Sequence, residues 1–545
     1  MKVLTVEIKP GTPSAMEDFG KRIDLAARGL DHEPLTRSLV LEMAPPSLRD
    51  NTAWVDRLVK TAAKAFNLDC VHAPLSLASS LARVLVESNY RVRATCAVRG
   101  RQGTMVDVRP ARGSEVNYGA AVDMGSTTLA LALVDLDGPG VIDELILPNP
   151  QTEYGADILT RAHLAEKAGG LDILVQCLRN GINGGLEKLC RGRGISTTDL
   201  TAAVLSGNTS MTHFVLGLPL RTLIREPYVP VINDPGEVKA KEIGLNLAPE
   251  APVLTLPNRG SYFGGDLMAG VVVSGMARRE EPSILVDVGT NAEVVLGQRD
   301  WLVGAAGAAG PALEGGVARM GMAARDGVVD RVRIDRVTKE VAYTTIGGAS
   351  PRGICGSGLI DLLAELFLSG LIDFQGKLTM PPGSPRRVET DEGPAFVVVP
   401  GTETENGEPI TLSEVEIDIL TRSKAGMYTI LTTVVKSVGL EFNQLERFFV
   451  AGTFGQYIDP AMAVAVGMIP DIPLERFVSL GNSSLKGAIL CLLSEAARQE
   501  VREVWRKLTY LEMNVNQELM NRFSAARFIP HTDRKRFPSV GSVIK

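Results

Sequence analysis

The spacing of hydrophobic and polar residues changes several times within the first 116 residues. Residues 1–9 alternate apolar and polar side chains as a strand does, and a polar stretch punctuated by Gly and Pro continues to about residue 37. The pattern beyond it predicts a strand at Leu39–Met43, helices over 52–66 and 75–87, and a strand over 90–98. We therefore expect a linker over residues 1–37 and a small α+β domain over residues 38–116.

From residue 117 onward, strand patterns alternate with helix patterns, which favours an α/β architecture. The pattern also repeats. Each repeat begins with two apolar strands joined by a short loop, and a later strand in each runs into a Gly-containing loop. Those later strands are Ala202–Leu205 and Phe448–Ala451. We expect a duplicated domain over 117–545 whose halves cover about 117–283 and 284–545.

The two hairpin loops share one chemical pattern, an Asp at the end of a strand followed by Gly and then hydroxyl or amide residues. Their sequences are Ala121-Val-Asp-Met-Gly-Ser-Thr-Thr128 and Leu285-Val-Asp-Val-Gly-Thr-Asn291. A Gly lets the backbone approach a ligand closely, and successive N–H groups with hydroxyls can cradle phosphate oxygens. A carboxylate beside polyphosphate needs a cation, and Mg²⁺ binds through few carboxylates plus phosphate oxygens.

A single loop of this kind is equally well explained as an ordinary hairpin turn, because Asp and Gly are standard turn residues. Two copies, each flanked by strands on both sides, favour a nucleotide site with the loops facing each other across a cleft.

Composition narrows the class of protein. Of 545 residues, 57 are basic and 63 acidic, and the net charge of −6 indicates neither a nucleic-acid partner nor a membrane surface. The basic cluster Arg534–Arg536 is interpreted as a solvated tail. The N-terminus lacks the apolar region of a signal peptide, and no apolar run approaches the roughly 18 residues of a membrane span. We expect a cytoplasmic protein.

The six cysteines are scattered and form no Cys-x-x-Cys pair, so their spacing indicates neither a zinc site nor an iron–sulfur cluster. Such sparse use of cysteine in a long chain fits a reducing compartment.

The Asp-x-Gly-Ser/Thr pair resembles phosphate motifs one and two of the superfamily that contains actin, sugar kinases, acetate kinase and the heat-shock chaperone ATPases. The loop Gly452-Thr-Phe-Gly455 resembles its adenosine motif. More specifically, a series of segments resembles the reductive activators of corrinoid proteins, in the order of that family and over nearly the whole chain. They are Pro45-Pro-Ser-Leu-Arg-Asp-Asn51, Asn149-Pro-Gln151, Tyr154-Gly-Ala-Asp157, Gly207-Asn-Thr-Ser-Met211, Asp287-Val-Gly-Thr-Asn291, Gly310-Pro-Ala-Leu-Glu-Gly315, Gly353-Ile-Cys-Gly-Ser-Gly358 and Gly452-Thr-Phe-Gly-Gln-Tyr457.

The resemblance implies a duplicated actin/sugar-kinase-like (ribonuclease H-like) ATPase domain preceded by the small α+β domain. It also implies an activity: ATP-dependent reduction of a corrinoid protein from Co(II) to Co(I). No Asp-x-His-x-x-Gly corrinoid signature surrounds any of the five histidines, so we expect the corrinoid to belong to a partner protein. Relatives further suggest a homodimer.

The superfamily motifs assign roles to residues of both loops. Asp123 and Asp287 are expected to bind Mg²⁺, through water, and to orient an attacking water. Phosphate contacts are expected from Gly125, Ser126, Thr127 and Thr128 in one loop and from Gly289, Thr290 and Asn291 in the other. Gly452, Thr453 and Gly455 are expected to let the adenosine lie against the backbone.

The chain departs from the family in its cysteines. A plant-type cluster needs a Cys-x₄-Cys-x₂-Cys run, which the sequence lacks, and its first residues resemble the stretch after the family's usual iron–sulfur domain. Three explanations stay open: a start codon placed too late, a trimmed chain, or a natural form with a separate electron donor. We expect no iron–sulfur cluster here, and a low-potential donor such as a ferredoxin.

Several further residues have two interpretations each. Glu293 holds a water or metal, or is a solvated strand position; Asn208 and Thr209 mirror the adenosine loop or form a structural turn. The Gly353–Gly358 loop is an anion or ribose site, or a point of close helix–sheet packing. For three residues a structural role is favoured: Asp157 as a helix N-cap, Cys355 as a small buried residue and His213 as a core histidine.

Two other functions remain possible for the same fold. One is a small-molecule kinase, which needs a carboxylate base beside an acceptor pocket that the sequence does not identify. The other is a nucleotide-switched binding module without redox chemistry.

Overall fold

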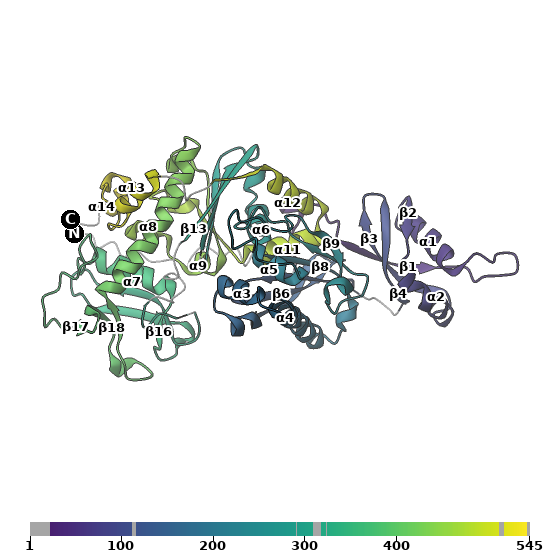
Figure 1. Cartoon of the computed structure of the whole chain (residues 1–545), viewed down its shortest axis with the longest axis horizontal. Coiled ribbons are helices and arrows are strands. Elements are labelled where there is room, and N and C mark those ends of the chain that lie inside the picture. The colour runs from purple at the N-terminus through teal and green to yellow at the C-terminus, as the bar shows by residue number, and fades with distance from the viewer. Residues whose placement is uncertain are drawn as a thin grey trace. The chain divides into compact units, whose positions relative to one another are not determined.

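The computed structural model describes residues 22–111, 116–289, 291–308, 318–322, 324–511 and 517–541. The chain forms two compact units (Figure 1). The N-terminal unit comprises the described residues between Met16 and Gly275 together with Ser483–Arg506. The C-terminal unit comprises the described residues of Met276–Asn482 and Lys507–Lys545. Each unit is described by itself.

The N-terminal unit begins with a small domain, a four-stranded sheet in the order β1-β3-β4-β2 on which two helices pack (Figure 1). Leu58 and Ala62 lie one helical turn apart on the buried face of α1 and pack with Leu85 of α2. The predicted strands and helices of this region are confirmed. The elements are β1 (Thr36–Glu42), α1 (Trp54–Ala65), β2 (Cys70–His72), α2 (Leu75–Glu87), β3 (Arg91–Arg99) and β4 (Gln102–Pro110).

A six-stranded sheet forms the rest of the N-terminal unit, in the order β7-β6-β5-β8-β10-β9. Strand β5 pairs antiparallel with β6 and parallel with β8, so the first hairpin and the later strand of the repeat are adjacent. The elements are β5 (Tyr118–Met124), β6 (Thr128–Asp135), β7 (Gly140–Pro148), α3 (Ile158–Ala165), α4 (Gly170–Gly192), β8 (Leu200–Gly207), α5 (Thr209–Leu216), β9 (Gly236–Lys239), β10 (Pro252–Thr255), α6 (Gly265–Ser274) and α11 (Ser483–Leu493).

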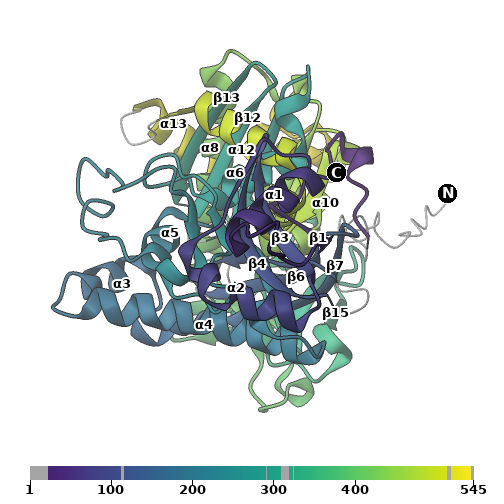
Figure 2. The same cartoon turned by 90° about the vertical axis from the view of Figure 1, so that its right-hand side faces the viewer.

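Helices cover both faces of this sheet, which explains why β5 and β6 are almost continuously apolar. Gly185 of α4 approaches Leu131 of β6, whereas Leu492 of α11 approaches Gly119 of β5. Gly119 pairs with Val134 and so faces the same side of the sheet as that residue. Val134 and Leu131 are three residues apart on β6, and an odd separation places them on opposite faces. Helices α4 and α11 therefore lie on opposite faces of the sheet. Helices α3 and α4 pack side by side (Figure 2).

The C-terminal unit contains a second six-stranded sheet in the order β21-β20-β11-β12-β13-β22. The run β13-β12-β11-β20-β21 repeats the order and the pairing directions of β7-β6-β5-β8-β10 in the other unit. The duplicated α/β fold predicted from the sequence is therefore confirmed. The strands are β11 (Ser283–Val288), β12 (Asn291–Gln298), β13 (Trp301–Ala308), β20 (Phe448–Ala451), β21 (Phe477–Gly481) and β22 (Leu508–Tyr510).

The remaining elements of the C-terminal unit include two three-stranded sheets, β15-β14-β16 and β17-β18-β19. Their strands are β14 (Val328–Ile334), β15 (Val341–Thr345), β16 (Gly353–Ile354), β17 (Arg387–Thr390), β18 (Gly393–Val399) and β19 (Ile410–Ser413). The remaining helices are α7 (Gly356–Leu368), α8 (Glu414–Ser437), α9 (Gly452–Tyr457), α10 (Pro460–Val466), α13 (Gln517–Ala526) and α14 (Pro538–Gly541), and α12 (Glu495–Lys507) ends where the chain re-enters this unit.

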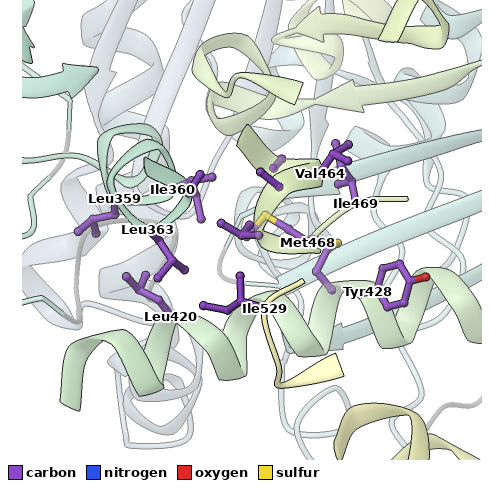
Figure 3. Packing of buried hydrophobic residues seen from close by; sticks show 14 of the residues in the cluster. Leu359, Ile360, Leu363, Leu420, Tyr428, Val464, Met468, Ile469 and Ile529 are labelled. Atoms are coloured by element: carbon purple, nitrogen blue, oxygen red, sulfur yellow. The ribbon is translucent and has the colours of Figure 1, made fainter. Parts of the chain in front are cut away.

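The core of the C-terminal unit joins α7, α8, α10 and the segment after α13 (Figure 3). Leu363 of α7, Leu420 of α8 and Ile529 point into the same buried cluster. The buried Lys424 of α8 holds that last segment, because its Nζ donates hydrogen bonds to the carbonyls of Phe528 (2.5 Å) and Pro530 (2.7 Å).

The basic cluster Arg534–Arg536 has exposed side chains, as expected, but it belongs to a packed segment in which Phe537 and Val540 are buried. Among the helices that the structure describes, none has the length and apolarity needed to cross a bilayer.

Candidate functional site

The first loop lies at the end of β5. Asp123 is the penultimate residue of that strand and is half-buried; Gly125, Ser126 and Thr127 form the turn, and Thr128 begins β6. Gly125 is needed for its size, since a Cβ there would lie 2.6 Å from the Thr128 carbonyl oxygen. The hydroxyl-bearing residues Thr127 and Thr128 are exposed, so they are accessible to a ligand.

A chain of hydroxyl groups orients the Asp123 carboxylate. Ser484, the second residue of α11, donates its hydroxyl proton to Asp123 Oδ1 at 2.7 Å. Its oxygen also lies 2.8 Å from Ser206 Oγ of β8. Both serines are buried, so this network holds one carboxylate oxygen in place within the N-terminal unit.

The backbone of the same loop is held from behind by two buried residues. Asn149 Nδ2 donates to the Gly125 carbonyl and the Asn149 backbone N–H donates to the Thr127 carbonyl, both at 2.8 Å. Arg161 of α3 donates through Nη1 to the Ser126 carbonyl at 2.6 Å. Three successive carbonyls of the loop are thus fixed by the protein interior.

The second loop lies at the corresponding place in the C-terminal unit. Asp287 is the penultimate residue of β11 and is half-buried, Gly289 follows the strand, and Asn291 begins β12. Thr290 lies outside the described residues, as do the side chains of Asn291 and Thr453. The residues 310–315 of the Gly-Pro-Ala-Leu-Glu-Gly segment also lie outside them.

Gly452 lies beside the Asp287 carboxylate, directly after the neighbouring strand β20. It follows β20, which pairs in parallel with β11 so that Asp287 lies opposite Ala451. Gly452 has a φ of +79°, and a Cβ placed on it would lie 2.8 Å from Asp287 Oδ1. Gly455, on the next turn, would carry a Cβ 2.8 Å from the Val450 carbonyl oxygen. The two glycines therefore let α9 begin directly against the Asp287 carboxylate and the end of β20.

Glu293 lies directly opposite Asp287 in the antiparallel pair β11–β12. Paired residues of an antiparallel sheet point to the same face, so the two carboxylates are neighbours. The first repeat differs here, because the residue opposite Asp123 is Ala130. Only the second loop thus has a cross-strand carboxylate pair, among the residues that the structure describes.

Asp157 and Asn208 are helix N-caps. Asp157 accepts from the Thr160 N–H at 2.9 Å at the start of α3, and this bond is the main reason that the pKa of Asp157 is lowered. Asn208 Oδ1 accepts from the Met211 N–H at 3.0 Å, and Thr209 donates to the Gly260 carbonyl at 3.0 Å. The structural interpretation is confirmed for these residues.

His213 is a satisfied core histidine, as expected. Its Nε2 accepts from the Val231 N–H at 3.0 Å, so Nδ1 carries the proton and donates to the Thr209 carbonyl at 2.8 Å. Burial lowers the pKa of His213, which favours this neutral form.

Cys355 is buried at the start of α7, with its Sγ 3.2 Å from Ser357 Oγ. A Cβ on Gly358 would lie 2.6 Å from the Val329 carbonyl oxygen of β14. The close-packing interpretation of the Gly353–Gly358 loop is therefore confirmed at Gly358.

Sequence reasoning gave no role to Ser206, Ser484, Asn149 or Arg161. Ser484 is 361 residues from Asp123 in the chain, and nothing in the local pattern connects the two. Asn149 and the segment before Arg161 did stand out as family-like segments, but their spacing alone does not tell which backbone groups they contact.

Comparison with known proteins assigns the chain to a family. Three family models match consecutive parts of it: the RACo linker region over residues 26–115, the RACo middle region over 118–279, and the C-terminal domain of RACo, the ASKHA domain, over 281–541. The domain boundaries predicted from the sequence stay predictions.

Two curated relatives have similar sequences. A corrinoid activation enzyme, RamQ, of Eubacterium limosum is 28% identical over 414 residues, which are 74% of this chain and 69% of the relative. The [Co(II) methylated amine-specific corrinoid protein] reductase of Methanosarcina barkeri is 24% identical over 427 residues, covering 72% and 73%.

A solved structure of a reductive activator for a corrinoid, iron–sulfur protein superposes with a TM-score of 0.86 at 36% identity. The match covers 96% of this chain and 83% of that one, and it extends across the linker, middle and actin-like ATPase regions. The chain therefore belongs to the family of reductive activators of corrinoid proteins.

Proposed function

We propose that this protein is an ATPase that reductively activates a corrinoid protein. One electron from a low-potential donor converts Co(II) to Co(I) in the partner, and hydrolysis of ATP to ADP and phosphate drives the step. Membership in the family supports this function, as do relatives whose names are corrinoid activation enzyme and Co(II) corrinoid protein reductase.

The observation that carries the nucleotide part is the repeat itself. Each unit has the same order over five neighbouring strands, and in each an Asp-x-Gly loop follows the central strand of that run, β5 or β11. The residues present suit Mg-ATP. Asp287 and Glu293 lie directly opposite each other on paired strands, so this end of β11 offers two neighbouring carboxylates, the kind of ligand that Mg²⁺ takes. Mg²⁺, if held there, would supply positive charge that neutralises phosphate oxygens.

The roles of the chain's own residues follow from this assignment. Asp123 and Asp287 orient water, on Mg²⁺ or in line for attack, and the Ser484 hydroxyl keeps the Asp123 carboxylate in one orientation. Ser126, Thr127 and Thr128, together with Gly289, Thr290 and Asn291, bind phosphate oxygens. Gly452, Thr453 and Gly455 form the adenosine side. A carboxylate needs no shifted pKa for this work, because phosphoryl transfer depends on positioning and charge neutralisation.

We further propose that the electron comes from a separate low-potential iron–sulfur protein, such as a ferredoxin. Four of the six cysteines, Cys96, Cys190, Cys355 and Cys491, are buried singly, which supports packing roles for them rather than electron transfer.

A homodimer, suggested by the family, is checked by sedimentation of the purified protein: a mass near 58.3 kDa contradicts it.

ATP hydrolysis measured with and without a partner tests this function. The protein is incubated with Mg-ATP and a corrinoid methyl-carrier protein held as Co(II), and then as methyl-Co(III). We expect turnover that rises with the Co(II) form and not with the methylated form. Hydrolysis that depends instead on a small alcohol, with formation of its phosphate ester, contradicts the proposal and identifies a kinase.

A further inference from the structure

Arg161 is a buried cation without a carboxylate partner in the described chain. Its side chain is fully inaccessible to solvent, and its hydrogen bonds go to carbonyl oxygens: Gly155 from Nε at 2.8 Å, Ser126 from Nη1 at 2.6 Å and Ala156 from Nη2 at 3.5 Å. Burying a charge that no opposite charge contacts is costly. Burial lowers the pKa of Arg161, with Asp157 acting in the opposite direction, but a guanidinium stays charged. Backbone carbonyls, one of them in the first loop, therefore compensate the buried charge.

The local sequence is built to place this guanidinium. Asp157 caps α3 and so fixes the helix that carries Arg161. Gly155 gives room for the side chain, because a Cβ there would lie 2.7 Å from Thr160 Cγ2 and 3.3 Å from Arg161 Cγ. The Tyr154-Gly-Ala-Asp157 segment thus supplies two of the carbonyls that Arg161 binds and the cap that aims it.

The contact with Ser126 determines the direction of a peptide group in the first loop. In a trans peptide the C=O of one residue and the N–H of the next point in opposite directions. Arg161 holds the Ser126 carbonyl toward the interior, so the Thr127 N–H points away from it. Asn149 holds the Gly125 carbonyl inward in the same manner, so the Ser126 N–H also points away.

We propose that Arg161 and Asn149 are positioning residues that turn two successive N–H groups of the first loop toward a polyphosphate anion. Successive N–H groups of this kind form an anion-binding concavity. The Arg161 charge lies directly behind the Ser126 peptide and adds a favourable field for the same anion. The inference rests on the proposed nucleotide function, and it names the groups that recognise the phosphates and the residues that orient them.

Arg161→Lys is the test variant, because Lys keeps the charge but loses the fork that binds several carbonyls at once. Asn149→Asp is the second variant, since it keeps the Oδ1 that accepts from Gln151 but removes the Nδ2 donor. Arg179→Lys is the matched control. Arg179 also donates two hydrogen bonds to one backbone carbonyl, Val215 at 2.9 and 2.8 Å, and burial also lowers its pKa, but it holds the end of α5.

Two measurements are made on each full-length variant, with thermal unfolding to establish that it is folded. Amide hydrogen exchange of the peptide that contains Ser126 and Thr127 is followed without nucleotide, and Mg-ATP affinity is measured by calorimetry. We expect Arg161→Lys and Asn149→Asp to exchange the loop faster and to weaken Mg-ATP binding about tenfold or more, the scale of one lost charged hydrogen bond. Arg179→Lys is expected to change neither.

Folded variants at Arg161 and Asn149 with wild-type loop exchange and wild-type affinity overturn the inference. If the wild-type protein itself binds no Mg-ATP, the proposed function fails, and loop exchange alone decides about Arg161 and Asn149. Faster exchange in both variants and not in Arg179→Lys then supports their positioning role, and unchanged exchange refutes it.

Discussion

The contact between Gly452 and the Asp287 carboxylate allows a direct test of the second loop. Gly452→Ala adds a single methyl group 2.8 Å from Asp287 Oδ1, where ordinary contacts begin at 3.4 Å. Asp287, the methyl group or both must therefore shift by roughly half an ångström. The φ of +79° adds backbone strain, which costs an Ala residue about 1–2 kcal/mol.

Gly439→Ala separates these two effects. Gly439 is in the same unit and has a φ of +73°, but nothing lies within 4 Å of a Cβ placed on it. Both variants carry similar backbone strain, and only Gly452→Ala displaces the carboxylate. Each is expected to lower the melting temperature by a few degrees, since about 1 kcal/mol shifts Tm by ~2–4 °C in a unit of this size.

Steady-state ATP hydrolysis measures the effect of displacing the Asp287 carboxylate, which only Gly452→Ala does. Misplacing a catalytic group by 1 Å costs on the order of 100-fold in rate, so a shift of half that distance is expected to lower kcat by about tenfold in Gly452→Ala. Gly439→Ala is expected to keep wild-type kcat at 25 °C. Equal kcat in the two variants refutes the reasoning, because either Asp287 does not move or its position does not matter for hydrolysis.

Three further predictions follow from single residues. Ser484→Ala removes the hydrogen bond to Asp123 and is expected to lower kcat for ATP roughly tenfold with a small change in Tm. The control Ser494→Ala, which removes a hydroxyl bonded to Asp31 in the same unit, should leave kcat unchanged. The reverse pattern contradicts the role of Ser484. Asp287→Ala is expected to abolish most Mg-ATP turnover with the fold intact by circular dichroism, and unchanged turnover refutes the assignment of Asp287. Burial raises the pKa of Asp361 to about 6 against the attraction of Arg333 (3.0 Å), so its proton stabilises the folded state at low pH and this contribution is lost as pH rises through 6. The Asn side chain of Asp361→Asn cannot titrate. Between pH 4 and pH 7, the free energy of unfolding of the wild type, measured with urea, should therefore fall by up to about 3 kcal/mol relative to that of the variant. Parallel pH profiles of the two proteins contradict the burial argument.

The sequence predicted those features that depend on neighbours in the chain. The Asp-x-Gly loops, the capping role of Asp157 and the strand Phe448–Ala451 follow from local propensity and were found as predicted. The repeat of strand order also follows, because each half has the same succession of hairpin and later strand.

The groups that orient the loops could not be predicted, because they arise from contacts between distant segments. Ser484 meets Asp123 across 361 residues, and Arg161 meets Ser126 only because the short turn after β7 brings α3 behind the hairpin. Gly452 was assigned to the adenosine on motif grounds, whereas its contact with Asp287 comes from the parallel pairing of β11 and β20. A buried Arg also resembles any surface Arg in a linear sequence.

Formation of Co(I) tests the central claim most directly. The protein is mixed with a Co(II) corrinoid protein, Mg-ATP, a reduced ferredoxin and a low-potential reductant, and the Co(I) absorption band is followed with time. We predict Co(I) only when this chain and hydrolysable ATP are both present, and much slower formation with the Asp287→Ala variant. Co(I) that forms at the same rate without ATP or with Asp287→Ala, or its absence with every donor despite intact Mg-ATP binding, contradicts the account.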